Sequence, residues 1–234
     1  NVTIHNLHIT NFTYGIKVDG SSPEISRNRL YDNDFNIAIT AGDGQTASPI
    51  IKNNLIYQSP AGAVSFGIEI GGSGTVSPKI YHNTIDGGLY DGIYIDGAGN
   101  TPEIKYNIIT NFGQYGIENY NSVGNPLIDY NDVWGNASGG YDHCSAGPHD
   151  ISSNPLYGSY PPLQVGSPCI DAIPPAAGDP VAEDFDGTAR PQGEGWDMGP
   201  YEFVHGTYNY QLPGGTGLAT DYRIFTVPLG LGTG

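Results

Sequence analysis

Apolar residues alternate with polar ones in short runs along the first two thirds of the chain, and the runs fall into a repeating phrase. The phrase P-x-I-x-x-N-x-[LIV] occurs five times, at intervals of 24 to 29 residues. Its copies start at Pro23, Pro49, Pro78, Pro102 and Pro126. A fixed phrase at this period indicates stacked structural repeats, so the pattern predicts the fold class before any chemistry is considered.

Each repeat has a second half, in which glycine or asparagine opens another apolar alternation. These alternations begin at Gly15, Asn36, Gly67, Gly92 and Gly116. Residues two apart on a strand share a face, so both halves of a repeat predict short strands. The turns between them are too short for a crossover helix, and each strand must therefore pair with its equivalent in the next repeat. We predict an all-β protein, a parallel β-helix of about six coils spanning residues 1–142.

In a β-helix the recurring apolar positions become columns of inward side chains. The first predicted column is Ile25, Ile51, Ile80, Ile104 and Ile128. The second is Leu30, Ile56, Ile85, Ile109 and Val133, and the third is Val18, Ile39, Ile70 and Ile95.

The asparagine of the phrase falls between two inward positions, where a corner between strands is expected. Its copies are Asn28, Asn54, Asn83, Asn107 and Asn131. Asparagine tolerates the left-handed backbone that such a corner needs, and stacked amides hydrogen-bond from one coil to the next. The pattern predicts an internal asparagine ladder. The alternative is a set of ordinary exposed turn residues.

Composition restricts the partners of the chain. Eight lysines and arginines oppose 24 aspartates and glutamates, which gives a net charge of -16. This charge opposes binding to nucleic acid or to an anionic membrane, and no run is apolar enough to insert into a bilayer. An acidic surface is compatible with divalent cations. The chain begins at Asn1 in a repeat-like segment without methionine, which indicates a processed or excised piece.

The phrase is lost after Asn136, and proline becomes frequent. Proline removes a backbone donor, so we expect residues 143–204 to form an irregular, proline-rich C-terminal cap. Cys144 and Cys169 lie in this region, and we expect a disulfide between them. The alternative is a pair of unlinked buried thiols. Low lysine content and this expected disulfide indicate a secreted or cell-surface protein.

A series of short motifs in the cap resembles a known family. SPCIDA at 167–172 is followed by DFDG at 184–187, by Arg190-Pro191 and by DMGPYEF at 197–203. This order resembles the closing segment of secreted bacterial right-handed parallel β-helix proteins, a group with the pectate-lyase-like superfold. The resemblance covers roughly residues 1–204 and departs from the family at Ile173, where glycine is usual. It implies a right-handed coil and secretion, and it implies no particular chemistry.

Asp184 and Asp186, followed by Gly187, also resemble the start of a calcium-binding loop. A complete loop of that kind needs further oxygen ligands at regular spacing, which do not follow here. Asp197 or Glu202 would have to complete a Ca²⁺ site. The alternative is a structural turn in which a carboxylate pairs with Arg190.

Residues 205–234 change character again, into a glycine-rich link and an isolated strand-like tail. The apolar and aromatic residues of the tail are Tyr222, Ile224, Phe225, Val227 and Leu229. A single strand has no core of its own, so the tail must pack on the coils, start another domain or insert into another molecule. Insertion into the open first coil of another copy would build filaments head to tail.

The best catalytic candidate is a column of outward positions on equivalent strands. Glu69, Tyr94 and Glu118 fall in this column, and Asp96 lies one residue pair further along. Equivalent positions are about 4.8 Å apart, so the two glutamates are separated by about 9.6 Å, at the upper edge of the range for an inverting glycosidase. Tyr94 would contact the sugar. An acidic rod also places two glutamates in one column by chance.

Other chemistry has weaker support. A polysaccharide lyase needs a basic residue beside a carboxylate-bound cation, and Lys52 and Lys105 flank Tyr81 on another column without such carboxylates. A column of Tyr31, Tyr57 and Trp134 has a polar centre, and the histidines show no spacing typical of metal ligands. We therefore expect first a structural or surface module that assembles through its ends. The alternative is a carbohydrate-active enzyme, a glycoside hydrolase or polysaccharide lyase, or a sugar-binding module.

Overall fold

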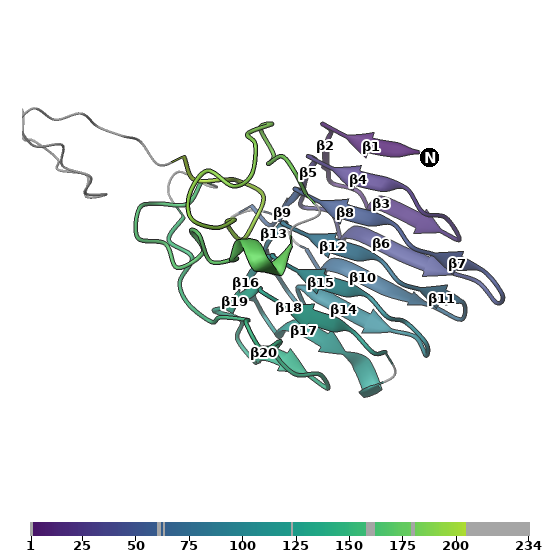
Figure 1. Cartoon of the computed structure of the whole chain (residues 1–234). Helices are drawn as coiled ribbons and strands as arrows, with labels where there is room; N and C mark the ends of the chain where they lie inside the picture. The colour runs from purple at the N-terminus through teal and green to yellow at the C-terminus, as the bar shows by residue number, and fades with distance from the viewer. Residues whose placement is uncertain are drawn as a thin grey trace, which may run out of the picture.

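The computed structural model describes residues 2–59, 62, 64–122, 124–157, 162–178 and 181–204. The chain winds into a right-handed parallel β-helix whose coils stack along one axis (Figure 1). Equivalent strands of successive coils form three parallel six-stranded sheets, here called sheets A, B and C. The predicted fold class is confirmed, since six coils wind through three sheets and no α-helix is found among the described residues.

Each coil contributes one strand to each sheet. Sheet A contains β1 (Thr3–His5), β4 (Glu24–Ser26), β8 (Ile50–Lys52), β12 (Lys79–Tyr81), β15 (Glu103–Lys105) and β18 (Leu127–Asp129). Sheet B contains β2 (His8–Thr10), β5 (Arg29–Tyr31), β9 (Leu55–Tyr57), β13 (Thr84–Gly88), β16 (Ile108–Phe112) and β19 (Asp132–Trp134). Sheet C contains β3 (Tyr14–Asp19), β6 (Phe35–Ala41), β10 (Phe66–Gly72), β14 (Ile93–Asp96), β17 (Tyr115–Asn119) and β20 (Gly139–Asp142).

Short elements complete the coils. A two-stranded sheet of β7 (Thr46–Ala47) and β11 (Thr75–Val76) extends two of them, and 3-10 turns are formed by η1 (Tyr120–Ser122) and η2 (Pro175–Ala177).

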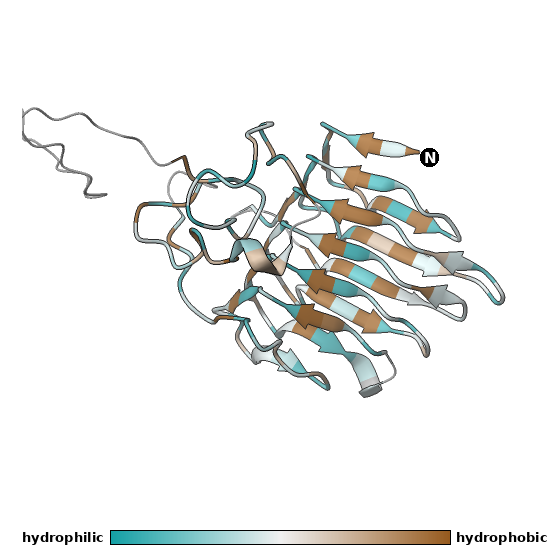
Figure 2. Cartoon of the chain, in the orientation of Figure 1, coloured by the Kyte–Doolittle hydropathy of each residue, from teal (hydrophilic) through white to brown (hydrophobic). Residues whose placement is uncertain are grey.

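The predicted interior columns are in register. Ile25 pairs with Ile51, Ile80 pairs with Ile104, and the second and third columns align in the same way. Figure 2 shows the result as brown bands at matching places in successive strands. Most column residues are fully removed from solvent and form one continuous core along the axis. The repeat therefore stabilises the rod, because equivalent apolar side chains of successive coils pack on one another.

The asparagine ladder is confirmed. Oδ1 of Asn107 accepts hydrogen bonds from the backbone N–H and the Nδ2 of Asn83, each at 3.0 Å. Nδ2 of Asn107 in turn donates to the carbonyl oxygen of Ile80 at 2.9 Å and to Oδ1 of Asn131 at 3.0 Å. Equivalent bonds link the other members, all of which are buried. The ladder satisfies buried backbone groups at the corner between sheets A and B.

One detail of that corner differs from the expectation. The left-handed backbone belongs to the residue before each ladder asparagine, with φ between 50° and 65°. These residues are Arg27, Asn53, His82, Tyr106 and Tyr130. The ladder asparagines do not have positive φ angles. The residue before each of them turns the chain, and the asparagine side chain then points into the interior. Rings of the corner residues stack outside the core, with 4.9 Å between the centroids of His82 and Tyr106.

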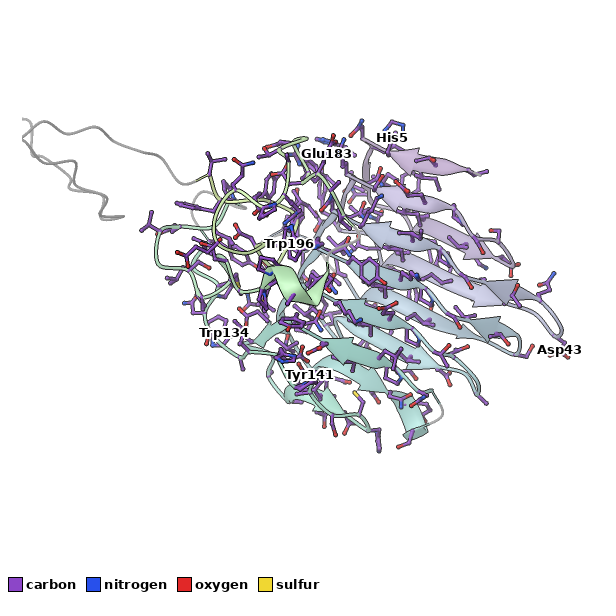
Figure 3. All side chains as sticks on the ribbon, viewed as in Figure 1. His5, Asp43, Trp134, Tyr141, Glu183 and Trp196 are labelled. Carbon is purple, nitrogen blue, oxygen red and sulfur yellow. The ribbon has the colours of Figure 1, made fainter. Side chains whose placement is uncertain are left out.

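Residues 143–154 end the coil stack. Asp150 ends the asparagine ladder, because its Oδ1 accepts the backbone N–H of Asn131 at 2.7 Å. Its other oxygen accepts the hydroxyl of Tyr141, also at 2.7 Å. Tyr141 and Cys144 pack against the last layer of the core. Figure 3 places Tyr141 at the end of the stack opposite His5.

The rest of the expected cap lies elsewhere. The described residues from 155 to 204 run back along the side of the rod, as the green and yellow loops of Figure 1 show, instead of covering its end. We call this stretch the flank segment. It reaches the first coils, where Arg27 and Glu183 form an ion pair of 2.7 Å. A second core joins it to the corner of sheets A and B. That core contains Tyr81, Tyr106, Ile108, Leu163, Cys169, Ile173, Val181 and Met198.

The predicted Cys144–Cys169 disulfide is wrong, because both cysteines are free. Cys144 packs against the core of the coils, and Cys169 is buried in the second core under the flank segment. Sγ of Cys169 donates to Oδ2 of Asp132 at 3.2 Å. The expectation failed because it assumed one compact cap, whereas the segment divides between the end and the side of the rod.

Two further expectations concern the C-terminal tail and insertion into a membrane. The strand-like tail with Tyr222 and Leu229 falls outside the described residues, as does all of 205–234. No helix within the described ranges is long and apolar enough to cross a membrane.

Candidate functional site

The outward column predicted on sheet C is present in register. Glu69 on β10 pairs with Tyr94 on β14, and Tyr94 pairs with Glu118 on β17. Lys17 and Ala38 precede them, and Asp142 on β20 follows Glu118. Asp96 lies at the outer end of β14, opposite Gly71. The structure thus brings Glu69, Tyr94, Asp96 and Glu118 onto one face.

Glycine at the start of most sheet C strands allows sheet C to pack closely at the corner with sheet B. A Cβ at Gly92 would lie 2.4 Å from Cγ2 of Ile109 and 2.6 Å from the carbonyl oxygen of Gly116. Only glycine therefore lets sheet C turn so closely onto sheet B. Ile93 and Ile95 then point into the core and are fully buried, so Tyr94 between them points outward.

A carboxylate that the sequence did not single out completes the column. Asp91, just before Gly92, is 1% exposed and shares a side-chain hydrogen bond with Glu118, which is 8% exposed. Oδ1 of Asp91 also accepts the backbone N–H of Tyr115 at 2.8 Å. Burial, with the hydrogen bond and the charge of Glu118, raises the pKa of Asp91 to about 7. Near neutral pH the Asp91 carboxyl group therefore keeps a proton beside Glu118.

The pKa values of Tyr94 and Glu69, which lie beside this pair, are also raised. Burial raises the pKa of Tyr94 to about 12, so its phenol stays protonated and is a hydrogen-bond donor. Glu69 is half-buried, and its pKa is raised by burial and by Asp96, while Lys17 lowers it. Two coil spacings of about 4.8 Å separate Glu69 from Glu118. Tyr94 thus lies between Glu118, which is hydrogen-bonded to Asp91, and the carboxyl group of Glu69.

A stripe of aromatic rings runs along the same face, with Tyr14 and Tyr120 exposed at its ends and half-buried rings between them. Ring centroids are 5.1 Å apart for Tyr14 and Phe35, 5.6 Å for Phe35 and Phe66, and 4.9 Å for Phe66 and Tyr94. Tyr120 continues the stripe at 5.8 Å from Tyr94. We call these five residues the aromatic stripe. Stacked rings on a solvent-facing sheet offer flat apolar surface with polar tips.

The stripe could have been found in the sequence. Tyr14, Phe35 and Phe66 each lie three residues before a member of the outward column, so they share one position in the repeat. The aromatic column predicted from the sequence is a different one. Its Tyr31 and Tyr57 stack at 5.0 Å on sheet B, away from the carboxylates of sheet C.

One group of side chains in the described part of the chain has the spacing of metal ligands. Ligand atoms of Glu118, Asp142 and His143 all lie within 4.8 Å of one another. Nδ1 of His143 is 2.9 Å from Oδ2 of Asp142. Carboxylate and imidazole together suit several divalent metals, but the arrangement is equally an ordinary ion pair beside a glutamate.

The residues expected to bind calcium lie in the flank segment. Asp184 is buried, and its two oxygens accept backbone N–H groups of Asp186, Thr188 and Glu202 at 2.7 to 3.0 Å. This is the geometry of a structural turn. Arg190 pairs with Glu202 at 2.8 Å. Calcium binding at Asp184 and Asp186 stays a prediction.

The lysines considered for lyase chemistry lie on sheet A. Lys52 pairs with Glu24 at 3.2 Å, and Lys105 pairs with Glu103 at 2.6 Å. Lys52 and Glu24 line a cavity of about 410 Å³ between sheet A and the flank segment, with the Arg27–Glu183 pair on its wall. These lysines are therefore engaged with carboxylates on a different face from Glu69 and Glu118.

Residues 1–154 match a family model described as a right handed beta helix region. No curated protein and no solved structure matches the chain.

Proposed function

Because the chain belongs to the family of right-handed β-helix regions, and because one of its exposed sheets combines carboxyl groups with aromatic rings, we propose that it is a carbohydrate-active enzyme. The proposed reaction is hydrolysis of an extended polysaccharide on the outer face of sheet C. Structural assembly through the ends of the rod and secretion stay predictions, since the tail expected to mediate assembly lies outside the described residues.

The hydrogen bond between the buried carboxyl group of Asp91 and the carboxyl group of Glu118 is the observation that carries this proposal. Glu118 lies in the outward column beside Tyr94, while Asp91 is almost fully buried behind it. With a pKa of about 7, Asp91 keeps a proton at neutral pH beside Glu118, which supports a general acid at this position. Glu69, at the other side of Tyr94, provides a carboxylate that deprotonates water.

The reaction follows from this arrangement. The Asp91–Glu118 pair donates its proton to the glycosidic oxygen as the bond from that oxygen to the anomeric carbon breaks. Water attacks the anomeric carbon from the opposite side and gives its proton to Glu69. A separation of about 9.6 Å between the two glutamates leaves room for this water and lies at the upper end of the range for inverting enzymes. We therefore expect inversion at the anomeric carbon.

The aromatic stripe supplies the binding surface in this proposal. Phe66 and Tyr94 lie next to the carboxyl groups, whereas Tyr14 and Phe35 extend the surface toward the first coil. Pyranose rings stack on such faces through their axial C–H groups. A stripe that crosses several coils favours a polymer over a short sugar.

The test is hydrolysis of a panel of polysaccharides by the wild type and by Glu118→Gln and Glu69→Gln variants. New reducing ends measure the rate, and proton NMR of the first product measures the anomeric configuration. Each substitution should lower kcat by about 10²-fold or more, which is the usual contribution of a general acid or base. Glu103→Gln on sheet A is the matched control, since its partly exposed pair with Lys105 is on another face. Equal activity of Glu118→Gln and the wild type, or no turnover of any polysaccharide, would overturn the proposal.

A further inference from the structure

The three sheets carry different charges on their strands. Sheet C has five acidic residues and one lysine: Asp19, Glu69, Asp96, Glu118 and Asp142, against Lys17. Sheet A has three acidic residues and three lysines: Glu24, Glu103 and Asp129, against Lys52, Lys79 and Lys105. The strands of sheet C therefore carry more acidic than basic residues, whereas the acidic and basic residues of sheet A balance.

The charges of sheet C lie where a bound chain would pass. Glu69 and Glu118 are in the outward column with Tyr94, and Asp96 is exposed on the same strand as Tyr94. Nζ of Lys17 lies 5.2 Å from the ring centroid of Tyr14, at the first-coil end of the stripe. The centre of the stripe is therefore negative, and the single cation of these strands is at its edge.

Uncompensated carboxylates repel an anionic polymer. Like charges at short range repel each other, so a polyuronate would be repelled at each carboxylate that it passes on this face. An amino group is attracted both by the carboxylates and by the faces of the aromatic rings. Since the protein around Glu69 and Asp96 is acidic, a positively charged sugar is the ligand that complements it.

We infer that the substrate is an unbranched polysaccharide that carries free amino groups, that is, a polymer of hexosamine without N-acetyl groups on at least some units. This inference rests on the proposed function and specifies its substrate. The chain lies along the aromatic stripe, across the strands, with its ammonium groups next to Glu69 and Asp96. Successive coils are about 4.8 Å apart, close to the length of one pyranose unit, so each coil contacts about one sugar.

Calorimetry with three oligosaccharides of equal length tests the inference. The probes are hexamers of β-1,4-linked glucosamine, of its N-acetylated form and of galacturonate, titrated into the full chain carrying Glu118→Gln to prevent turnover. At low salt the glucosamine hexamer should bind about tenfold more tightly than the neutral one, and the galacturonate hexamer most weakly. The preference should shrink in salt, because the Debye length falls from about 30 Å at 0.01 M to about 8 Å at 0.15 M.

A matched pair of variants tests whether the preference for the glucosamine hexamer arises on sheet C. Asp96→Asn, added to the same background, should lower the affinity for the glucosamine hexamer about threefold to tenfold and leave the neutral hexamer nearly unchanged. Asp129→Asn makes the same change on sheet A and should affect neither probe.

Failure of the inference differs from failure of the proposed function. Galacturonate that binds as tightly as glucosamine, or an Asp96→Asn effect equal to that of Asp129→Asn, would overturn the inference while hydrolysis of another polysaccharide still supported the function. Absence of binding by all three probes, together with wild-type activity in Glu118→Gln, would overturn both.

Discussion

Nη1 of Arg190 lies 2.8 Å from Oε2 of Glu202, and neither side chain has any exposed surface. Arg190 also donates to the carbonyl oxygens of Asp197 and Gly199 and, at 3.3 Å, to Oδ1 of Asn53 on the coil corner. The RP and YEF motifs therefore form a structural clasp. Their role is to attach the flank segment to the coils.

Arg190→Met should destabilise this attachment by about 3–5 kcal/mol, because it leaves the carboxylate of Glu202 buried without its partner. Trp196 lies in the flank segment, and its fluorescence during urea denaturation, in a Trp134→Phe background, measures the loss.

Arg27→Met is the control, since its ion pair with Glu183 is partly exposed and should contribute about 1 kcal/mol or less. Combining Arg190→Met with Glu202→Leu should recover part of the lost stability, because no charge then stays buried alone. Similar losses for Arg190→Met and Arg27→Met would contradict a clasp role for Arg190.

Asn107→Ala tests the asparagine ladder. The substitution leaves the backbone N–H of Asn83 and the carbonyl oxygen of Ile80 without the partners they have in the coil interior. Each unsatisfied buried group costs about 1–3 kcal/mol, so the free energy of unfolding should fall by about 3 kcal/mol or more. Urea denaturation followed by circular dichroism measures it. Asn154→Ala, which removes one exposed hydrogen bond to Leu156, should cost less than about 1 kcal/mol, and a comparable loss at both positions would argue against the ladder.

The coils could be predicted from the sequence because every copy of the phrase has the same types of residue at equivalent positions. Ile80 and Ile104 occupy the same position of the phrase and so pair in the structure. The repeat also predicted the outward column of Glu69, Tyr94 and Glu118. Once the inward residues of neighbouring strands are in register, their outward residues align as well.

Contacts that depend on non-repeating geometry could not be predicted. Asp91 lies one residue before the glycine that opens the alternation, and its hydrogen bond to Glu118 joins two different coils outside the repeated phrase. The path of the flank segment has no periodic signal, because its contacts with Asn53 and Tyr106 join residues far apart in the chain. The disulfide expectation failed for this reason, since sequence proximity of Cys144 and Cys169 says nothing about which core each enters.

Asp132→Asn should change how stability depends on pH. Asp132 is fully buried, and burial raises its pKa from 3.8 to about 6. The folded protein therefore holds this proton at pH 4 to 6 while the unfolded chain releases it, so stability falls as pH rises through this window. The loss is roughly 3 kcal/mol by pH 7, and the variant should avoid it. Urea denaturation at pH 4 and pH 7 measures the difference.

The control for this measurement is Asp43→Asn, because Asp43 is exposed in a turn that Figure 3 shows at the edge of the rod. It should reproduce the wild-type pH dependence. A variant at Asp132 that follows the wild-type curve at both pH values would contradict the assignment.

Asp91→Asn should move the pH profile of the proposed hydrolysis. In the wild type, kcat/KM should fall above a pH of about 7, where Asp91 loses the proton that it holds beside Glu118. Asparagine removes the carboxylate that holds this proton in place, so the fall should begin at a lower pH, while Asp96→Asn should leave its position nearly unchanged. Rates from pH 4 to 9, measured as new reducing ends, distinguish the two. Because Asp91 acts through Glu118, activity at the acidic optimum should persist in Asp91→Asn but be lost in Glu118→Gln, and an unshifted profile would show that the pair is not the acid.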